Sequence, residues 1–281
     1  RRAKNDFKDR IAVFSPEEYK REVAFHHTLT EFQYALSNER ITYYLQPQVD
    51  METGEIIGAE ALTRWIDKDG SLIPPATFIP ALEESGFVVT LDKYIWQGVA
   101  SWLRTRLDQG LPVVPISLNV SRVDILACDV AEHMGALATQ YNLPPELMRI
   151  EITETAYTGE SEAVDRLTAE LHNRGFSTYM DDFGTGQSTL AMLKSVNVDV
   201  IKLDRTFVPA GKADERSTQI VSSMLGMAQS LKLPVVIEGV ETEGQAQLLR
   251  QMGARFAQGF LYYRPMPAKD FEALLDSGGD N

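Results

Sequence analysis

Residues 176–190 read FSTYMDDFGTGQSTL, in which a short apolar run ends in Asp181 and Asp182 and continues into a glycine-rich turn. Gly184 and Gly186 permit positive φ and a close approach of the backbone to a ligand. Because consecutive strand residues point to opposite faces, the two acids can share a metal pair only where the strand ends and the backbone turns. The alternative is an ordinary Asp-rich turn that caps the next helix.

The same arrangement recurs along the chain, since eight short apolar runs each carry a polar residue at or near their end. These residues are, in order, Gln46, Glu60, Asn119, Glu151, the pair Asp181–Asp182, Lys202, Glu238 and Gln258. Eight apolar runs separated by mostly helical stretches predict an α/β fold, a TIM-like (β/α)8 barrel of about 250 residues. The carboxyl ends of the strands carry the chemistry in that fold, so we expect these side chains to converge on one rim.

One connection departs from the regular barrel pattern. The turn METGE (51–55) separates the apolar runs 41–48 and 55–62 and is too short for a helix. These two strands should therefore form a hairpin, with the first strand antiparallel to the rest. The other expected strands are 113–119, 147–153, 176–181, 198–203, 233–238 and 255–261. The expected helices are 16–39, 88–108, 122–141, 160–174, 187–195, 214–231, 243–252 and 267–275.

The bulk composition narrows the class of protein. With 281 residues, of which 44% are hydrophobic and 24% charged, the chain has an ordinary globular composition that suits one barrel domain. No apolar run approaches the ~18–20 residues of a membrane span, so we expect no membrane contact by this segment. The single cysteine, Cys128, excludes an internal disulfide and fits a cytoplasmic location, although a parent protein could be membrane-tethered upstream. The net charge of −13 argues against a DNA or RNA duplex as partner.

The N-terminal segment differs in character from the acidic body that follows. Residues 1–15 are basic and then apolar. Ser15 followed by Pro16 is a typical helix start. We therefore expect a linker helix within 16–40. The main domain should occupy 41–276, and the tail 277–281 should be disordered.

The segment IEITET places Glu151 on the strand face opposite its flanking isoleucines. In a barrel that face points inward, where an unpaired carboxylate is costly. A bound metal ion explains it, and an ion pair with Lys202 or Arg64 is the alternative. Glu154 lies one step past the rim and could hold the loop 181–186 through hydrogen bonds to its backbone.

Three further polar residues have both a functional and an ordinary interpretation. Glu60 ends a run of small and apolar residues, and Arg64 offers a guanidinium suited to a phosphate, unless the two form an ion pair. The Asn119 side-chain carbonyl could bind a hard metal ion, although turn-forming asparagines are commoner. Lys202 beside several carboxylates stays protonated, so it would orient a water or hold a phosphate oxygen rather than act as a base. Its alternative is an ion pair in the barrel interior.

Glu238 could bind a metal ion or take a proton from an attacking water, whereas Glu241 also fits an acid that opens a helix. All histidines fall in expected helices and suggest surface or packing roles: His26, His27, His133 and His172. Ligation by oxygen alone favours Mg²⁺ or Mn²⁺ over zinc. Two such ions ~3.5–4 Å apart would support in-line cleavage of a phosphodiester.

With these residues in view, the chain resembles an EAL domain, the cyclic di-GMP phosphodiesterase family. The resemblance covers roughly 30–275 and begins with the triplet Glu60-Ala61-Leu62. It further rests on QPQVD (46–50), PATFIPALEESG (75–86), SLNVS (117–121), EITET (151–155), DDFGTG (181–186), IKLD (201–204), EGVET (238–242) and QGF (258–260). It implies a TIM-like barrel with one antiparallel strand and hydrolysis of cyclic di-GMP to linear pGpG.

The resemblance also implies a role for each site residue. Metal ligands would be Glu60, Asn119, Glu151 and Asp181 for one ion, and Asp181, Asp182 and Glu238 for the other. The catalytic group would comprise Lys202 near the attacking water, Asp182, and Glu238 as candidate base. Substrate-binding residues would be Gln46, Arg64, Glu241, Gln258 and Phe260, supported around the loop by Glu154, Thr185 and Asp204.

Some positions depart from the family pattern without removing a metal ligand. Gln187 replaces a usual aromatic residue, Thr63 a larger apolar residue, and Phe260 a usual tyrosine, which puts rate and affinity in question. A receptor that binds cyclic di-GMP without cleaving it, and regulates a partner domain, is the alternative function. The resemblance further implies a homodimer, in which Leu190, Met192 and Leu193 could supply an apolar patch, with packing in the core as the commoner alternative for such residues. Residues 1–15 resemble the end of a GGDEF domain, which implies a tandem GGDEF–EAL parent.

Overall fold

A computed structural model of the chain describes residues 15–159, 161–184, 197–209 and 215–278. Its strands are β1 (Ile41–Asp50), β2 (Ile56–Ile66), β3 (Leu72–Ile73), β4 (Ile116–Val120), β5 (Met148–Thr153), β6 (Thr178–Phe183), β7 (Val200–Leu203), β8 (Val235–Glu238), β9 (Phe256–Gln258) and β10 (Met266–Pro267). The α-helices are α2 (Pro16–Ser37), α3 (Pro75–Ser85), α4 (Val88–Asp108), α5 (Arg122–Ala127), α6 (Val130–Gln140), α7 (Glu154–Gly159), α8 (Ser161–Asn173), α10 (Glu215–Ser230), α11 (Glu243–Gln251) and α12 (Ala268–Asp276).

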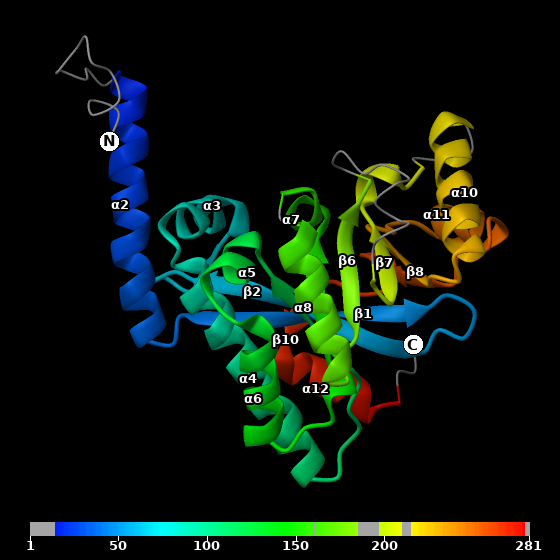
Figure 1. The fold of residues 1–281 in the computed structure, drawn as a ribbon, viewed down its shortest axis with the longest axis horizontal. Coiled ribbons are helices and arrows are strands. Elements are labelled where there is room, and N and C mark those ends of the chain that lie inside the picture. Colours follow the sequence, from blue (N-terminus) through cyan, green and yellow to red (C-terminus); the bar gives the residue numbers. More distant parts are fainter. Residues whose placement is uncertain (1–14, 160, 185–196, 210–214, 279–281) are drawn as a thin grey trace. The chain divides into compact units, whose positions relative to one another are not determined.

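Eight of these strands close into a barrel. The order runs β1-β9-β8-β7-β6-β5-β4-β2, and a further pairing between β1 and β2 closes the ring. From β2 through β4 to β9 the neighbours are parallel, with β6, β7 and β8 side by side in Figure 1. β1 instead pairs antiparallel with β9. The predicted TIM-like barrel with one antiparallel strand is therefore confirmed.

The chain divides into two compact units. One contains Arg1–Thr42, as far as it is described, and Arg64–Phe87, and the other contains Tyr43–Thr63 and Val88–Asn281. The first unit holds α2, α3 and the β2–β3 pairing of Trp65 with Ile73. The second unit holds most of the barrel.

In the second unit the barrel strands are buried on both faces, as β5 illustrates. Ile150 and Ile152 are fully shielded on one face of the strand, and Glu151 between them is 1% exposed on the other. A parallel strand covered by helices outside and by side chains inside has this pattern. The barrel interior therefore contains charged groups that must find partners within the protein.

Most of the expected elements agree with the structure to within a few residues. Ser15 caps α2 as predicted, since its side chain accepts a hydrogen bond from the Glu18 N–H in a capping box. The expected helix 122–141 was wrong, because the chain leaves the helix at Cys128 and Asp129 caps a new one by accepting from the Glu132 N–H at 2.8 Å. The structure also contains α3 and α7, which were not expected. The expected helix 187–195 lies outside the described residues.

Candidate functional site

The polar residues at the ends of the barrel strands form one buried cluster in the second unit. The register places Asn119 beside Glu151 and Glu238 beside Gln258. Each lies near the carboxyl end of a parallel strand. These ends meet at one rim of the barrel, which brings together residues that are far apart in the sequence. The cluster also includes Gln46 from β1, Glu60 from β2, Asp181 from β6 and Lys202 from β7.

Lys202 is the centre of this cluster and is fully buried. Its Nζ lies 2.6 Å from Glu151 Oε2 and 2.6 Å from Glu238 Oε1. It also lies 3.0 Å from Glu60 Oε2 and 3.1 Å from Asp181 Oδ1. The ion pair between Glu151 and Lys202, weighed as an alternative to metal binding, is therefore present.

One ammonium cannot satisfy four carboxylates. Glu151 Oε1 and Asp181 Oδ1 are buried and accept no hydrogen bond from any described residue. The Asp181 oxygen is near Lys202 but lacks hydrogen-bonding geometry. A buried acceptor without a donor costs roughly 1–3 kcal/mol, and more when it is charged. The donor set is all oxygen and carries excess negative charge, so these residues fit divalent cations such as Mg²⁺ or Mn²⁺.

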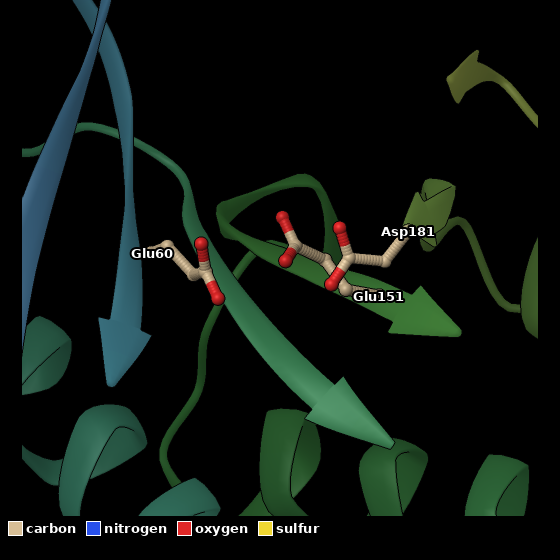
Figure 2. Close-up of side chains that lie close together, drawn as sticks. All are labelled: Glu60, Glu151 and Asp181. Carbon is tan, nitrogen blue, oxygen red and sulfur yellow. The ribbon is translucent and has the colours of Figure 1, made fainter. Parts of the chain in front are cut away.

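Two overlapping groups of carboxylates have the spacing of metal ligands. Glu60, Glu151 and Asp181 offer ligand oxygens within 4.8 Å of one another, and so do Asp181, Asp182 and Glu238. Asp181 belongs to both groups. Figure 2 shows Glu151 and Asp181 adjoining, with the Glu60 side chain extending toward them from β2, which β4 separates from β5.

Burial and crowding move the pKa values of these acids. Burial raises the pKa of Glu238 to about 8 and that of Asp182 to about 6, and neighbouring carboxylates add to both rises. Burial also raises the pKa of Glu151 well above its usual value. Burial acts in the same direction on Glu60, but Lys202 and two amide hydrogen bonds lower its pKa below the usual value. Burial opposes the charge of Lys202, yet the surrounding carboxylates hold its pKa well above the usual value.

The backbone is irregular where β6 ends. The pairing of β6 with β7 shifts register between Met180 and Phe183, and Asp182 has φ of 56°. Positive φ is uncommon outside glycine, with Asp among the tolerated residues. At this turn Asp181 and Asp182 each have a carboxylate oxygen in the same candidate ligand group. Glu154, fully buried at the start of α7, accepts a 2.7 Å hydrogen bond from the Gly184 N–H.

Amide side chains line the opposite part of the cluster. Gln258 Nε2 donates to Glu60 Oε2 at 2.7 Å and to Gln46 Oε1 at 3.2 Å. Gln258 Oε1 accepts from Gln48 Nε2 at 3.0 Å, and Asn119 Nδ2 donates to Glu60 Oε1 at 2.9 Å. Gln48 was not predicted, although it follows Gln46 by two residues and therefore shares its strand face.

A cavity of about 280 Å³ opens beside the acids. It is lined by Gln46, Glu60, Leu62, Asp181, Arg205, Glu238, Gly239, Glu241, Gln258, Gly259, Phe260 and Pro265. Phe260 is 47% exposed, and the Arg264 guanidinium lies 4.3 Å from its ring centroid. Arg205 was not predicted, and its position directly after IKLD was the available signal. It packs on Gly239, where φ is 68° and a Cβ would come within 2.3 Å of the Arg205 Cβ.

Other predicted residues have different surroundings. Arg64 lies on β2 in the first compact unit, and Thr185 and Gln187 lie outside the described residues. Asp204 caps a short 3-10 turn by accepting from the Thr206 N–H at 2.9 Å. Glu241 lines the cavity with its side chain exposed.

The histidines lie in helices, as expected: His26 and His27 in α2, His133 in α6 and His172 in α8. His172 Nε2 lies 2.9 Å from Asp199 Oδ2, and the His133 ring packs 5.7 Å from that of Trp96. Within the described ranges, no helix is both long enough and apolar enough to cross a membrane.

The chain is similar to several curated bacterial proteins. It is 37% identical over 238 residues to the cyclic di-GMP phosphodiesterase RocR of Pseudomonas aeruginosa, covering 84% of this chain and 60% of RocR. It is 32% identical over 250 residues to the probable cyclic di-GMP phosphodiesterase PdeB of Escherichia coli, covering 88% of this chain and 46% of PdeB. The chain thus spans only part of these relatives, and about 30% of others.

The fold is also shared with solved structures. The PaMucR phosphodiesterase in complex with c-di-GMP matches with a TM-score of 0.82 at 31% identity, covering 87% of this chain and 99% of that one. The EAL domain model matches residues 29–265, a range that begins inside the expected linker helix. This match covers most of the chain. The protein therefore belongs to the EAL domain family.

Proposed function

We propose that this chain hydrolyses the cyclic dinucleotide cyclic di-GMP to linear 5′-pGpG with the help of two divalent cations. The observation that carries the proposal is the excess of buried acceptors around Lys202. Four carboxylates surround one ammonium, and two of their oxygens accept no hydrogen bond from the described residues. Relatives named as cyclic di-GMP phosphodiesterases support the choice of substrate.

The two carboxylate groups that share Asp181 would hold the cations. Glu60, Glu151 and Asp181 would bind one ion together with Asn119, and Asp182 and Glu238 would bind the other with Asp181. Such ions, Mg²⁺ or Mn²⁺, would lower the pKa of a bound water and offset the charge on the phosphate.

The side chains would divide the remaining work. The Lys202 ammonium, which stays protonated, would donate hydrogen bonds that orient the attacking water. A carboxylate oxygen of Glu238 would take the proton from that water. The water oxygen then forms a bond to phosphorus as the bond to the ribose 3′ oxygen breaks, and that oxygen gains a proton. Each turnover consumes one water and leaves a 5′ phosphate.

The cavity beside the acids would hold the rest of the substrate. Gln46 and Gln258 face it with amide groups, and Phe260 offers an exposed ring for a purine base. Glu241 could accept from the base edge. Arg64, on the continuation of β2 past Glu60, is proposed as a ligand of a substrate phosphate.

Larger assembly is a separate proposal. The relatives extend beyond the matched segment, and one of them, MucR of Pseudomonas aeruginosa, is named a bifunctional diguanylate cyclase and phosphodiesterase. We propose an upstream GGDEF-like partner domain within the parent chain, a homodimer, and a boundary of the catalytic domain near 41–276. The expected dimer patch with Leu190, Met192 and Leu193 lies outside the described residues, as do residues 1–14 of the expected remnant.

Chromatography of products tests the proposed reaction. Wild-type protein incubated with cyclic di-GMP and Mg²⁺ or Mn²⁺ should yield pGpG, and EDTA should abolish the product. Glu60→Ala should lower the rate by more than about 100-fold, the upper range for residues that only support a metal ligand. Glu146→Ala removes an exposed acid and is the matched control. Binding of cyclic di-GMP without any product would instead assign the chain to a receptor.

A further inference from the structure

A second cavity lies in the first compact unit, apart from the residues of the proposed reaction. Its volume is about 230 Å³. It is lined by His27, Thr28 and Glu31 from α2, Arg40 directly before β1, Trp65, Asp67 and Lys68 around the end of β2, Ile73 from β3, and Thr77 and Phe78 from α3. We propose that this cavity binds a small carboxylate with a compact apolar body.

The cavity walls contain hydrogen-bond donors that lack acceptors. Trp65 is 2% exposed, and its indole N–H has no partner among the described residues. Arg40 Nε and Nη2 are also buried without a hydrogen bond to any described residue. Buried donors are nearly always paired in native proteins, so three such groups on one cavity need an explanation. A ligand that supplies acceptors is the simplest one.

The acid nearest to Arg40 is already engaged elsewhere. Glu31 accepts from Lys68 Nζ at 3.1 Å, whereas Arg40 Nη2 lies 3.7 Å from Glu31 Oε2, beyond hydrogen-bond distance. Arg40 Nη1 makes only a long contact of 3.5 Å with the Ile66 carbonyl. Two formal cations and two formal anions line the cavity, the latter including Asp67. The formal charges of these four side chains therefore cancel before a ligand carboxylate is added.

Part of the cavity wall is apolar. Phe78 is 1% exposed, its ring centroid lies 5.2 Å from that of Trp65, and Ile73 lines the same space. A free inorganic oxyanion would leave these surfaces uncovered, whereas a carboxylate on an aromatic or branched aliphatic body would cover them. The volume is below the roughly 300–1,000 Å³ of drug-sized pockets, which restricts the ligand to a small molecule.

The chain contains three tryptophans, which provide an internal control for a binding experiment. Trp96 Nε1 donates to the Asn119 carbonyl at 3.0 Å, and Trp102 Nε1 donates to Glu272 Oε1 at 2.7 Å. Within the described ranges, the Trp65 indole N–H has no such partner. Titration of ¹⁵N-tryptophan-labelled protein with benzoate should therefore move the Trp65 indole resonance in a saturable way, and the other two much less. Trp65→Phe assigns that resonance by its disappearance.

Two variants and three additional probes make the experiment decisive. Arg40→Gln should weaken benzoate binding by about tenfold or more, the worth of a charge-assisted hydrogen bond. Arg174→Gln changes the net charge equally at an exposed ion pair with Glu132 and should leave the affinity unchanged. Benzyl alcohol and sulfate should each bind more weakly than benzoate, and isobutyrate should bind as a smaller carboxylate.

Several outcomes would overturn the proposal. A Trp65 resonance that ignores benzoate and isobutyrate would show that water alone satisfies the donors. Sulfate binding as well as benzoate would show a general anion site without a role for the apolar walls. Arg40→Gln and Arg174→Gln having equal effects would remove Arg40 from recognition. None of these readouts depends on hydrolysis of cyclic di-GMP, so they leave the proposed reaction untouched.

Discussion

The barrel centre and the cavity of the first unit are opposite cases of incomplete pairing. Around Lys202 the buried groups that find no partner in the described part of the chain are acceptors, namely oxygens of Glu151 and Asp181. Around Trp65 and Arg40 they are donors. In both regions the unpaired atoms themselves are buried, so bulk solvent does not reach them.

The difference indicates what each region can bind. Excess acceptors with negative charge favour a cation, and excess donors beside an apolar wall favour an anion with an apolar body. An unpaired polar group indicates a ligand only when it is buried, because an exposed polar group would simply bind water. The following changes test the two regions against each other, from the largest expected effect to the smallest.

Lys202→Met removes the one side-chain cation that, among the residues the structure describes, contacts the four carboxylates. We expect a loss of about 3–5 kcal/mol in the free energy of unfolding without metal, because the buried acids lose their partner. Urea unfolding in EDTA measures the change. Added Mg²⁺ should restore part of the stability of this variant.

Glu151→Gln is the opposing control, because it removes one of the four acids that share Lys202 and leaves Lys202 in place. We expect its stability in EDTA to equal or exceed that of the wild type, although pGpG formation should fail. A Lys202→Met protein as stable as the wild type would contradict the proposed charge imbalance.

Glu154→Ala removes the acceptor of the Gly184 N–H and leaves the acids of the cluster unchanged. Because the chain turns here directly after Asp181 and Asp182, we expect a roughly 10–100-fold loss of hydrolysis, as for other supports of metal ligands. Initial rates of pGpG formation give the effect. Glu154→Gln keeps one acceptor oxygen and should lose less, and equal losses for both variants would count against the hydrogen bond.

Trp96→Phe and Trp65→Phe compare a paired indole N–H with an unpaired one. Both side chains are almost fully buried, and both variants lose the same volume. Only Trp96→Phe leaves a carbonyl, that of Asn119, without its donor. We expect Trp96→Phe to lower the free energy of unfolding by about 1 kcal/mol more than Trp65→Phe in urea titrations. Equal losses would mean that the Trp65 N–H is satisfied by a partner.

The sequence predicted the barrel because the alternation of strands and helices is visible in local residue patterns. Apolar runs that end in one polar residue specified most strands, and METGE specified the hairpin of β1 and β2. Sequence patterns missed the break between α5 and α6, because Asp129 caps a new helix within a continuous helical pattern. They missed α7 as well, since EITET was interpreted only as a strand and its rim.

The same patterns predicted the site residues whose contacts depend only on their position along a strand. Glu60, Glu151, Asp181, Lys202 and Glu238 were named from the ends of their strands, and the structure brings them together around one ammonium. Gln48 was missed although its spacing from Gln46 was visible. Arg205 was missed because it lies past the end of its strand. The alternation of strand residues no longer indicates there which way a side chain points.

The sequence by itself determined the barrel, the set of acidic and amide residues at its strand ends, and the family to which the chain belongs. It could do so because strand period and strand end are local properties that fix which face and which rim a side chain occupies. Only the tertiary structure decided which polar groups find partners: the sharing of Lys202 among four acids, the oxygens left over, and the donors of Trp65 and Arg40. The hydrogen bonds and ion pairs of these groups depend on distances between segments far apart in the chain, and local sequence patterns do not specify those distances.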